Sequence, residues 1–582
     1  MDYIPAGKAR TTMNRTIQLI ILIVCFAAAT WLAHAFHDSP RVGIDDANIY
    51  FTYAENLASG NGITYGHNPE HTEGATSMLW LLICAFVFWT GHTESAVLVL
   101  SVCLMIATQW IILNAIYRYA AQKNKKAWPY VCGYMALILC SPSYITWMSI
   151  TLMDTCLWGL FIAGMTWFVL FPPESTRQRW IASIPFVLAP WSRPEGMLVA
   201  PVLVALLWFR SSSAGFHRAT RYCAGICGAM IVLLASLTVF RLMYFGYPLP
   251  NPYYAKVSPF ILYNLWGGLK YLGSFIASGY LMKGFSVILL LILIVLLANA
   301  FHGLWNRKPV RMLYLHETSA LVALFLLFVP VLSGGDHFTM FRFYQPAYPV
   351  ICLTFILWLF DLRVTHLSYT DNIRSPWIRY ANLAVLVPVI AYFLLLHAFK
   401  YSYTWPGMQN NESPMYMELF LAEKGRYQGD VLARLFAKSR DYPTIGVITA
   451  GGIARTYPGP IVDLMGLNNN LIAHFRGDRK GVKNHAAFEK ALFFGLKTDL
   501  LLIDPSGWSM GMTKGLLIDP RFVEEWSYGA LSLREDPECF IDAYVHKSFL
   551  NDVRMKSFFQ FHEKRMIWSE KLKKWVEVAA AP

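Results

Sequence analysis

The stretch FSVILLLILIVLLANAF, residues 285–301, runs for seventeen residues without a charged side chain. An apolar run of about 17–25 residues is long enough for a helix to cross the ~30 Å hydrocarbon core of a bilayer. Comparable runs recur along the 582-residue chain, which is 56% hydrophobic and only 15% charged, whereas a soluble protein carries about 25% charged residues. The sequence therefore predicts a polytopic α-helical membrane protein, because helices satisfy their own backbone hydrogen bonds in lipid.

The formal net charge is +13, and a basic balance of this size can indicate a nucleic-acid partner. Here the basic residues lie in short loops between apolar runs, as in QKNKK (122–126), which is the positive-inside pattern of membrane proteins. We therefore expect membrane lipids and no nucleic acid among the partners. The basic N-terminal segment lacks a small-residue cleavage site after its apolar run, so residues 16–36 are predicted to stay as the first span.

We expect the N-terminus in the cytoplasm, and the positive-inside rule then gives the direction in which each later apolar run crosses the membrane. The run SMLWLLICAFVFWTG (77–91) is about fifteen residues long, which is short for a crossing, and counting it would place QKNKK outside. We interpret it as a juxtamembrane or re-entrant helix on the outer face. The pattern then predicts about 11 transmembrane helices, with a long outer loop ending near residue 283, and the crossings are residues 16–36, 96–117, 128–147, 154–171, 180–191, 197–209, 222–244, 285–301, 319–332, 343–360 and 380–399.

Beyond residue 399 the sequence has mixed polarity and no long apolar run. We divide the chain into a transmembrane module, residues 1–399, and a soluble C-terminal domain on the outer, periplasmic side, residues 400–582, which is long enough to fold around its own core. TIGVITAGGIARTYPG (444–459) and DLLLIDP (499–505) are typical of short buried strands, whereas HAAFEKALFFGLK (485–497) has helical periodicity. The domain is therefore predicted to be α/β or α+β.

The unusual polar motifs all fall on the outer face in this topology. The first is GIDDANIYFTYAENLASGNGITYG (43–66), which places adjacent carboxylates, Asp45 and Asp46, where the first span meets water. Ionised groups so close to hydrocarbon are costly and are commonly functional. Segments far apart in sequence thus bring carboxylates and cations to one membrane face, and this convergence predicts a site at the lipid boundary. The other motifs are EHTEGATS (70–77), TLMDT (151–155), SRPEG (192–196), YPLPNPYYAK (247–256) and GGDHFTMFR (334–342).

Group transfer from a lipid-borne donor fits these side chains. A glycosyl group leaving a polyprenyl phosphate needs a base near the acceptor hydroxyl and cations near the departing phosphate. Asp45 or Asp46 can be the base, because repulsion between close carboxylates raises one pKa. Arginine can hold a phosphate through two parallel hydrogen bonds. The candidates for the donor phosphate are Lys256, Arg193, Arg342 and His337, and those for substrate binding are Glu73, Glu195, Asp336 and Tyr254.

Structural interpretations stand beside these roles. Asp45 or Asp46 can cap the following helix, as Asp154 can cap its own. Arg193 can pair with Glu195 within a turn, Lys256 can reach lipid headgroups, and His337 can be a structural hydrogen-bonding group. No P-loop, dinucleotide-binding turn or HExxH motif occurs. No cofactor is indicated, although Asp45, Asp46 and Asp336 leave binding of Mg²⁺, Mn²⁺ or Ca²⁺ open.

Five ordered blocks carry a resemblance to a known family: DDANIYFTYAENLASGNGITYGHNPEHTEGATSMLW (45–80), RPEG (193–196), FGYPLPNPYYAK (245–256), GGDHFTMFRFYQPAYP (334–349) and IVDLMGLNNNLIA (461–473). In this order the sequence resembles the terminal arabinofuranosyltransferases of mycobacterial cell walls and their bacterial relatives, which belong to the GT-C superfamily of membrane glycosyltransferases. The resemblance implies a polyprenyl-phosphate donor, decaprenyl-phosphate D-arabinofuranose or a close analogue, and a catalytic aspartate matching Asp45 or Asp46. The segment ITLMDT around Asp154 departs from the Gly–Met/Leu–Glu pattern of the family.

We therefore expect a GT-C type glycosyltransferase in a bacterial inner membrane, with its active site facing the periplasm. The acceptor stays open between an envelope glycan and a surface protein, because a similar arabinosyltransferase modifies type IV pilins. One rival function is a transporter or flippase for lipid-linked sugars, which would place ionisable groups near the midplane and broken helices in matched halves. Another is a surface polysaccharide polymerase or ligase, which uses a pyrophosphate-linked donor.

Overall fold

The computed structural model describes residues 15–37, 42–68, 70–213, 215–305, 313–361, 415–439, 441–477, 487–503, 507–569 and 574–578. The chain divides into two compact units. The first, here called the helical unit, comprises Met1–Ser39, Leu98–Leu234 and Leu265–Tyr416. The second, called the sheet unit, comprises Pro40–Val97, Ala235–Asn264 and Met417–Pro582.

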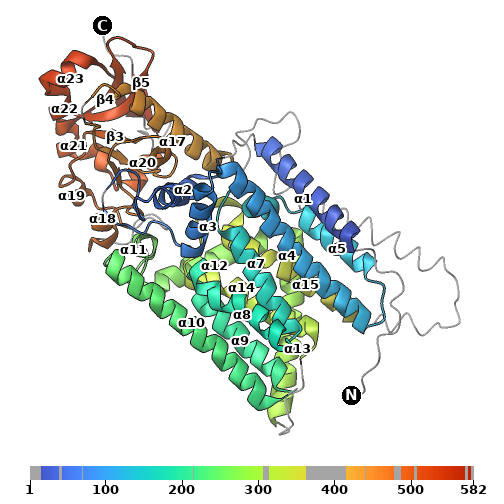
Figure 1. The fold of residues 1–582 in the computed structure, drawn as a ribbon. Helices are drawn as coiled ribbons and strands as arrows, with labels where there is room; N and C mark the ends of the chain where they lie inside the picture. Colours follow the sequence, from blue (N-terminus) through green and yellow to red (C-terminus); the bar gives the residue numbers. More distant parts are fainter. Residues whose placement is uncertain are drawn as a thin grey trace. The chain divides into compact units, whose positions relative to one another are not determined.

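The helical unit is built from apolar helices that pack against one another. Helices α7, α8 and α9 form one group of neighbours, and α14 packs on α15 (Figure 1). Three helices, α4, α10 and α12, begin or end in the sheet unit. The elements are α1 (Arg15–His37), α4 (Glu94–Gln122), α5 (Trp128–Leu139), α6 (Pro142–Met148), α7 (Thr155–Leu170), α8 (Thr176–Ser192), α9 (Gly196–Ser212), α10 (Phe216–Tyr244), α12 (Ile261–Ala277), α13 (Tyr280–Trp305), α14 (Leu315–Leu332), the 3₁₀ segment η1 (Thr339–Ala347) and α15 (Tyr348–Asp361).

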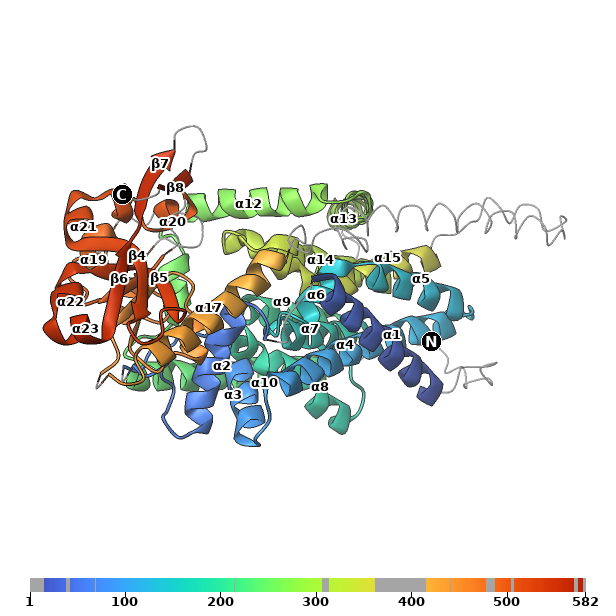
Figure 2. The same ribbon diagram turned by 90° about the horizontal axis from the view of Figure 1, so that it is seen from above.

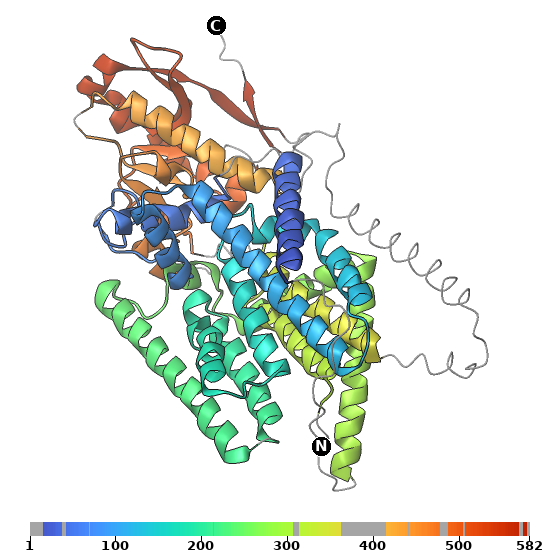
Figure 3. The same ribbon diagram turned by 45° about the vertical axis from the view of Figure 1, so that its right-hand side comes forward.

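Long apolar helices confirm that the chain is a polytopic helical membrane protein, but they do not support 11 crossings. Six described helices are long and apolar enough to span a bilayer, and the count is seven if one bent pair makes a single span. The predicted crossing at residues 380–399 lies outside the described residues, as does the domain boundary at residue 399. The six include α10, the long green helix of Figure 3, and their spans are Arg15–Ala35, Glu94–Gln122, Phe216–Tyr244, Leu281–His302, Leu315–Leu332 and Thr339–Asp361.

The remaining predicted crossings are short or broken. The crossing predicted over residues 128–147 is the pair α5 and α6, which meet at 73°. Ser141 lies in the extended region (φ −108°, ψ 90°) because Pro142 follows it and disfavours helical backbone there. Helices α7, α8 and α9 have only 16, 17 and 17 residues. These lengths lie at or just below the lower limit of about 17 residues for a full span, because prolines and polar turns end the helices early.

The loop predicted up to residue 283 was also wrong in part. It contains the short helix α11 (Asn251–Lys256) and the 17-residue helix α12. Several large apolar side chains of α12, including Leu262 and Trp266, are exposed. Polar residues at its other positions interrupt the apolar sequence, so uniformly apolar runs did not predict this helix.

A six-stranded mixed sheet organises the sheet unit, with the strand order β2-β1-β3-β5-β4-β6. Strand β1 pairs in parallel with β2 and β3, and the pairs β3–β5, β5–β4 and β4–β6 are antiparallel. Figure 2 shows β4, β5 and β6 side by side. The strands are β1 (Ile445–Val447), β2 (Ile461–Asp463), β3 (Leu500–Leu502), β4 (Trp526–Leu533), β5 (Phe540–His546) and β6 (Phe559–Glu563), with β7 (Arg565–Ser569) and β8 (Lys574–Val578) as a separate antiparallel pair.

The two predicted strand regions are confirmed as β1 and β3, whereas residues 485–497 contain only the four-residue helix α19 in their described part.

The unit also holds α2 and α3, which pack together, and α11, which packs on α18. Two segments that precede residue 399 thus belong to the same compact unit as the C-terminal sheet. Its helical elements are α2 (Asp45–Ala58), α3 (Met78–Trp89), α11, α17 (Tyr416–Leu435), η4 (Ile453–Arg455), α18 (Asn470–His474), α19 (Lys490–Phe493), α20 (Gly507–Met512), η5 (Leu516–Ile518), α21 (Pro520–Glu525), α22 (Lys547–Asn551) and α23 (Val553–Phe558).

Candidate functional site

The adjacent carboxylates lie in the first turn of α2. The N-cap of this helix is Ile44, and no side chain forms a capping hydrogen bond, so the capping interpretation of Asp45 and Asp46 is wrong. The Asp45 carboxylate instead accepts hydrogen bonds from the amides of Gly452 (2.7 Å) and Gly451 (3.0 Å), which follow β1. A Cβ atom on Gly451 would lie 1.8 Å from the carbonyl oxygen of Asp45, so only glycine permits this approach. The contact fastens the first loop to the carboxyl end of the parallel strands.

A second buried aspartate, Asp463, ends the neighbouring strand β2. Its side chain is fully buried and accepts hydrogen bonds from the amides of Met465 and Asn468 and from the Asn468 side chain, each at 2.9 Å. Burial raises the pKa of Asp463 to about 6, and the charge of Asp45 adds to the shift. Burial likewise raises the pKa of Asp45 to about 6, against the opposing effect of the Gly452 and Gly451 amides. Both carboxyl groups therefore have pKa values above the usual range of an aspartate.

Asp46 has a different environment from Asp45. Its Oδ2 lies 3.6 Å from Nζ of Lys256, the last residue of α11, and the two side chains are 20% and 19% exposed. A carboxylate and an ammonium group are thus close together and both accessible. Lys256 lies twelve residues after the end of α10, which is a candidate membrane span.

Glu73 and Tyr254 also belong to the sheet unit but differ in accessibility. Both Glu73 oxygens accept hydrogen bonds from Arg241 of α10, at 2.7–3.0 Å, and the two side chains are only 2% and 7% exposed. Glu73 is therefore part of a buried ion pair. Tyr254 stands partly exposed in α11, with its ring 4.2 Å from that of His474 in α18.

The other predicted residues form a cluster in the helical unit. Asp154 is the N-cap residue of α7, yet its carboxylate makes no capping bond and binds Nη1 of Arg193 through both oxygens at 3.0 Å. Nε and Nη2 of Arg193 bind Glu195 at 3.2 Å. The predicted pairing of Arg193 with Glu195 is confirmed, and each of the three nitrogens of this guanidinium group already faces a carboxylate.

The GGDHFTMFR motif holds Arg342 against Asp336. Nε of Arg342 donates to Asp336 at 2.7 Å, and the guanidinium group lies 4.2 Å from the centre of the Phe338 ring. The backbone before Arg342 is strained, because Met340 and Phe341 both have positive φ (58° and 56°), a region that side chains disfavour.

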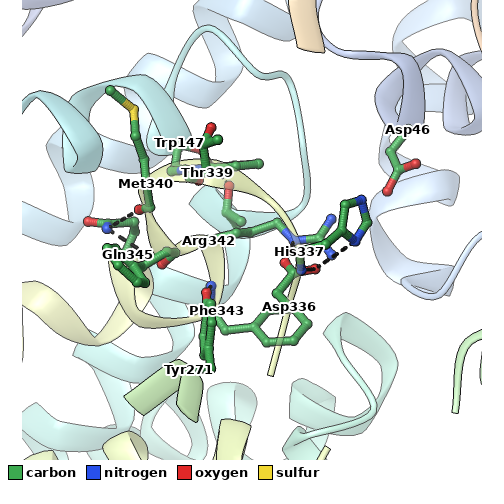
Figure 4. Close-up of polar contacts among 12 residues, drawn as sticks. Asp46, Trp147, Tyr271, Asp336, His337, Thr339, Met340, Arg342, Phe343 and Gln345 are labelled. Carbon is green, nitrogen blue, oxygen red and sulfur yellow. Dashed lines mark hydrogen bonds and ion pairs between the residues drawn. The ribbon is translucent and has the colours of Figure 1, made fainter. Parts of the chain in front are cut away.

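Hydrogen bonds from neighbouring side chains hold this strained turn (Figure 4). Trp147 Nε1 donates to the Thr339 carbonyl at 3.1 Å, and Gln345 Nε2 donates to the Met340 carbonyl at 2.6 Å. The amide of His337 donates to Asp336 at 2.9 Å, and its ring Nδ1 lies 3.5 Å from the same carboxylate. Asp336, His337 and Arg342 therefore form one partly neutralised group.

Five of the predicted residues thus lie in each unit. The sheet unit holds Asp45, Asp46, Glu73, Tyr254 and Lys256, and the helical unit holds Arg193, Glu195, Asp336, His337 and Arg342. The prediction that all ten line one pocket concerns both units and stays a prediction. Sequence reasoning gave no role to Arg241, Gly451, Gly452 or Asp463. An arginine near the end of the apolar run 222–244, a glycine pair after a strand and an aspartate before three asparagines were the available signals.

The carboxylates do not fit a resident divalent cation. No group of three or more His, Cys, Asp or Glu side chains within the described ranges is arranged to hold a metal ion. Asp45 accepts from two amides, Asp46 faces Lys256, and Asp336 faces Arg342. Each is committed to a positive or hydrogen-donating partner, so we do not propose a metal.

Comparison with models of known protein families and with curated proteins found no match to this chain.

Proposed function

We propose that the chain is a membrane glycosyltransferase that moves a sugar from a polyprenyl-phosphate donor to an acceptor hydroxyl, with Asp46 as the catalytic base. The observation that carries the proposal is the accessible pair of Asp46 and Lys256, 3.6 Å apart. A base for the acceptor and a cation for the departing phosphate are the two groups that this transfer requires. Both lie on elements close to a membrane-spanning helix, where a lipid-borne substrate is available.

In the proposed step, the acceptor oxygen attacks the anomeric carbon of the donor as Asp46 takes the hydroxyl proton. The bond between the anomeric carbon and the phosphate oxygen breaks, and its electron pair leaves with the polyprenyl phosphate. Lys256 stabilises the negative charge that the phosphate gains. A general base contributes a factor of about 10²–10⁴ to a rate, and this sets the expected loss when Asp46 cannot accept a proton.

The surroundings of the two carboxylates favour Asp46 over Asp45. Both oxygens of Asp45 already accept amide hydrogen bonds from Gly451 and Gly452, and a carboxylate held in this way is best suited to fixing the loop. Asp45 is accordingly a positioning residue. It presents its neighbour to the substrate by attaching the start of α2 to the sheet.

The resemblance to GT-C arabinofuranosyltransferases supports the finer assignments within this proposal. They are a decaprenyl-phosphate D-arabinofuranose donor or a close analogue, an inner-membrane location, and a site facing the periplasm. The acceptor is an envelope glycan or a surface protein such as a type IV pilin. Arg193, Arg342 and His337 stay candidates for the donor phosphate. Arg193 and Arg342 would have to release carboxylate partners to serve in that role.

The decisive experiment incubates the purified full-length protein with synthetic polyprenyl-phosphate pentoses and hexoses and measures release of polyprenyl phosphate. The Asp46→Asn variant is expected to lose at least 10²-fold in rate. Lys256→Met is expected to lose donor turnover, and Lys256→Arg to keep part of it. The matched control is Lys438→Met, which removes an exposed lysine of the same unit. Wild-type rates in Asp46→Asn would refute the assignment, and movement of the intact donor across the membrane without phosphate release would favour a flippase.

A further inference from the structure

A polar cavity lies in the sheet unit, and neither Asp46 nor Lys256 lines it. Its volume is about 310 Å³, which is at the lower end of the ~300–1,000 Å³ typical of small-molecule sites. It is formed by the end of α2, the end of α3, the turn that follows α3, the first residue of α4, and η4. The lining residues are Glu55, Ala58, Ser59, Phe88, Trp89, Gly91, His92, Thr93, Glu94 and Arg455.

Arg455 is the central polar group of this cavity. Its side chain is 10% exposed, and its guanidinium group donates to Glu55, to Glu94 at 3.0 Å and to the Phe51 carbonyl at 3.2 Å. Nε of Arg455 is buried and has no hydrogen-bond partner among the described residues.

The charges around the cavity balance. Glu94 also accepts from Arg426 at 2.9 Å, so two carboxylates, Glu55 and Glu94, face two guanidinium groups, Arg426 and Arg455. The site therefore offers fixed acceptors and donors without net charge, which favours a neutral, hydroxyl-rich ligand over an anion.

Aromatic side chains supply the apolar part of the lining. Trp89 is 69% exposed, and Phe88 lies beneath the guanidinium group of Arg455, with its ring centre 5.6 Å away. An accessible indole is a flat surface with an apolar body and a polar edge. Such a surface can pack against the C–H face of a sugar ring while the hydroxyl groups reach Glu55, Glu94 and Arg455.

We infer that this cavity is a saccharide-binding subsite that takes a neutral sugar ring on Trp89, with its hydroxyl groups on Glu55, Glu94 and the guanidinium group of Arg455. If the proposed function holds, the subsite carries part of a glycan acceptor. Glu94 begins α4, a candidate membrane span, so the bound glycan would lie close to the bilayer surface. The inference concerns binding and requires no sugar donor.

The test is saturation-transfer NMR on the full-length protein in detergent, with neutral galactan, arabinan and glucan tetrasaccharides as probes. At least one probe is expected to bind, and Trp89→Ala and Glu55→Gln are each expected to weaken its binding at least tenfold. The matched control is Trp128→Ala, which removes a tryptophan of similar exposure (64%) from the start of α5. Glu55→Gln keeps the size of the side chain, and hydrogen exchange of α2 would establish that the variant is folded.

Three results would overturn the inference. The first is the absence of binding for every saccharide up to millimolar concentrations, and the second is binding that both variants leave unchanged. The third is displacement of the saccharide by glycerophosphoethanolamine, which would make the cavity a lipid headgroup site. Because the probes are tested without donor, saccharide binding in a protein that releases no polyprenyl phosphate would refute only the proposed function. Phosphate release in a protein that binds no saccharide would refute only this subsite.

Discussion

Removing the negative charge of Glu73 should destabilise the sheet unit far more than removing an exposed carboxylate. Glu73 and Arg241 are 2% and 7% exposed and share three hydrogen bonds of 2.7–3.0 Å. The Glu73→Gln variant keeps the shape of the side chain but leaves the Arg241 charge buried without its counter-ion. Breaking such a pair typically costs about 3–5 kcal/mol. At 1.36 kcal/mol for each factor of ten, this corresponds to a change of roughly 10²–10⁴ in the opening equilibrium.

Hydrogen exchange on the full-length protein can measure this change. Amides of α2 that exchange through opening of the unit should exchange about 10²-fold faster or more in Glu73→Gln. The double variant Glu73→Gln/Arg241→Met, in which the buried cation is also removed, should recover most of the loss. The matched control is Glu535→Gln, because the Lys438–Glu535 pair is 69% and 60% exposed and such pairs contribute about 0–1 kcal/mol. If Glu73→Gln exchanges like Glu535→Gln, the buried ion pair does not stabilise the unit as argued.

Three further predictions concern the sheet unit and the helical unit. Gly451→Ala should lower the unfolding temperature markedly and cost about 3 kcal/mol of stability, because its Cβ would overlap Asp45. The control Gly225→Ala in α10 places its Cβ where no atom lies within 4 Å, so it should be neutral or stabilising. Equal melting temperatures for the two variants would contradict this prediction. The pKa of Asp463 is raised from 3.8 to about 6 in the folded protein, so the folded state binds this proton more tightly than the unfolded state does. The resulting contribution to the free energy of unfolding is fully present below about pH 4 and is lost as the pH rises through 6, by about 3 kcal/mol in total. Unfolding free energies between pH 4 and 7 should therefore depend less on pH in Asp463→Asn, and parallel profiles would exclude the effect. Gln345→Ala should destabilise the strained turn before Arg342 by about 1–3 kcal/mol, measured as faster exchange of the 339–347 amides, since its Nε2 holds the Met340 carbonyl.

The sequence was sufficient for the features that depend on local pattern. Uniform apolar runs predicted the six long spans, and the apolar stretches around Ile445 and Leu500 predicted strands β1 and β3. The pattern was less reliable where proline ended a helix, as at Pro142, and where a helix was amphipathic, as in α12. These failures arise because a threshold on hydrophobicity detects neither a broken helix nor a half-apolar one.

The sequence indicated which residues belong to the candidate site but not which of them contact one another. Asp46 and Lys256 stand out as charged residues at the ends of apolar segments, and they do lie together. Glu73 looked equally suited to substrate binding, yet its partner Arg241 is 168 positions away and only the fold shows the pairing. The contact between Asp45 and Gly451 joins residues 406 positions apart. Tertiary packing determines such pairs, and a short stretch of sequence carries no information about it.

The interleaving of the sheet unit has a consequence for how the protein is made. Residues 417–582 alone form the strands, but Asp45, Tyr65 and Asn68, which hydrogen-bond to Gly451, Ala450 and Ile461, leave the ribosome some 400 residues earlier. Asp45 therefore lacks its hydrogen-bond partners until translation is almost complete, whereas the partner of Asp46, Lys256, is synthesised earlier. Nascent chains that stop before β1 would lack the partners of Asp45, and expression of the C-terminal segment by itself would leave one edge of its sheet uncovered.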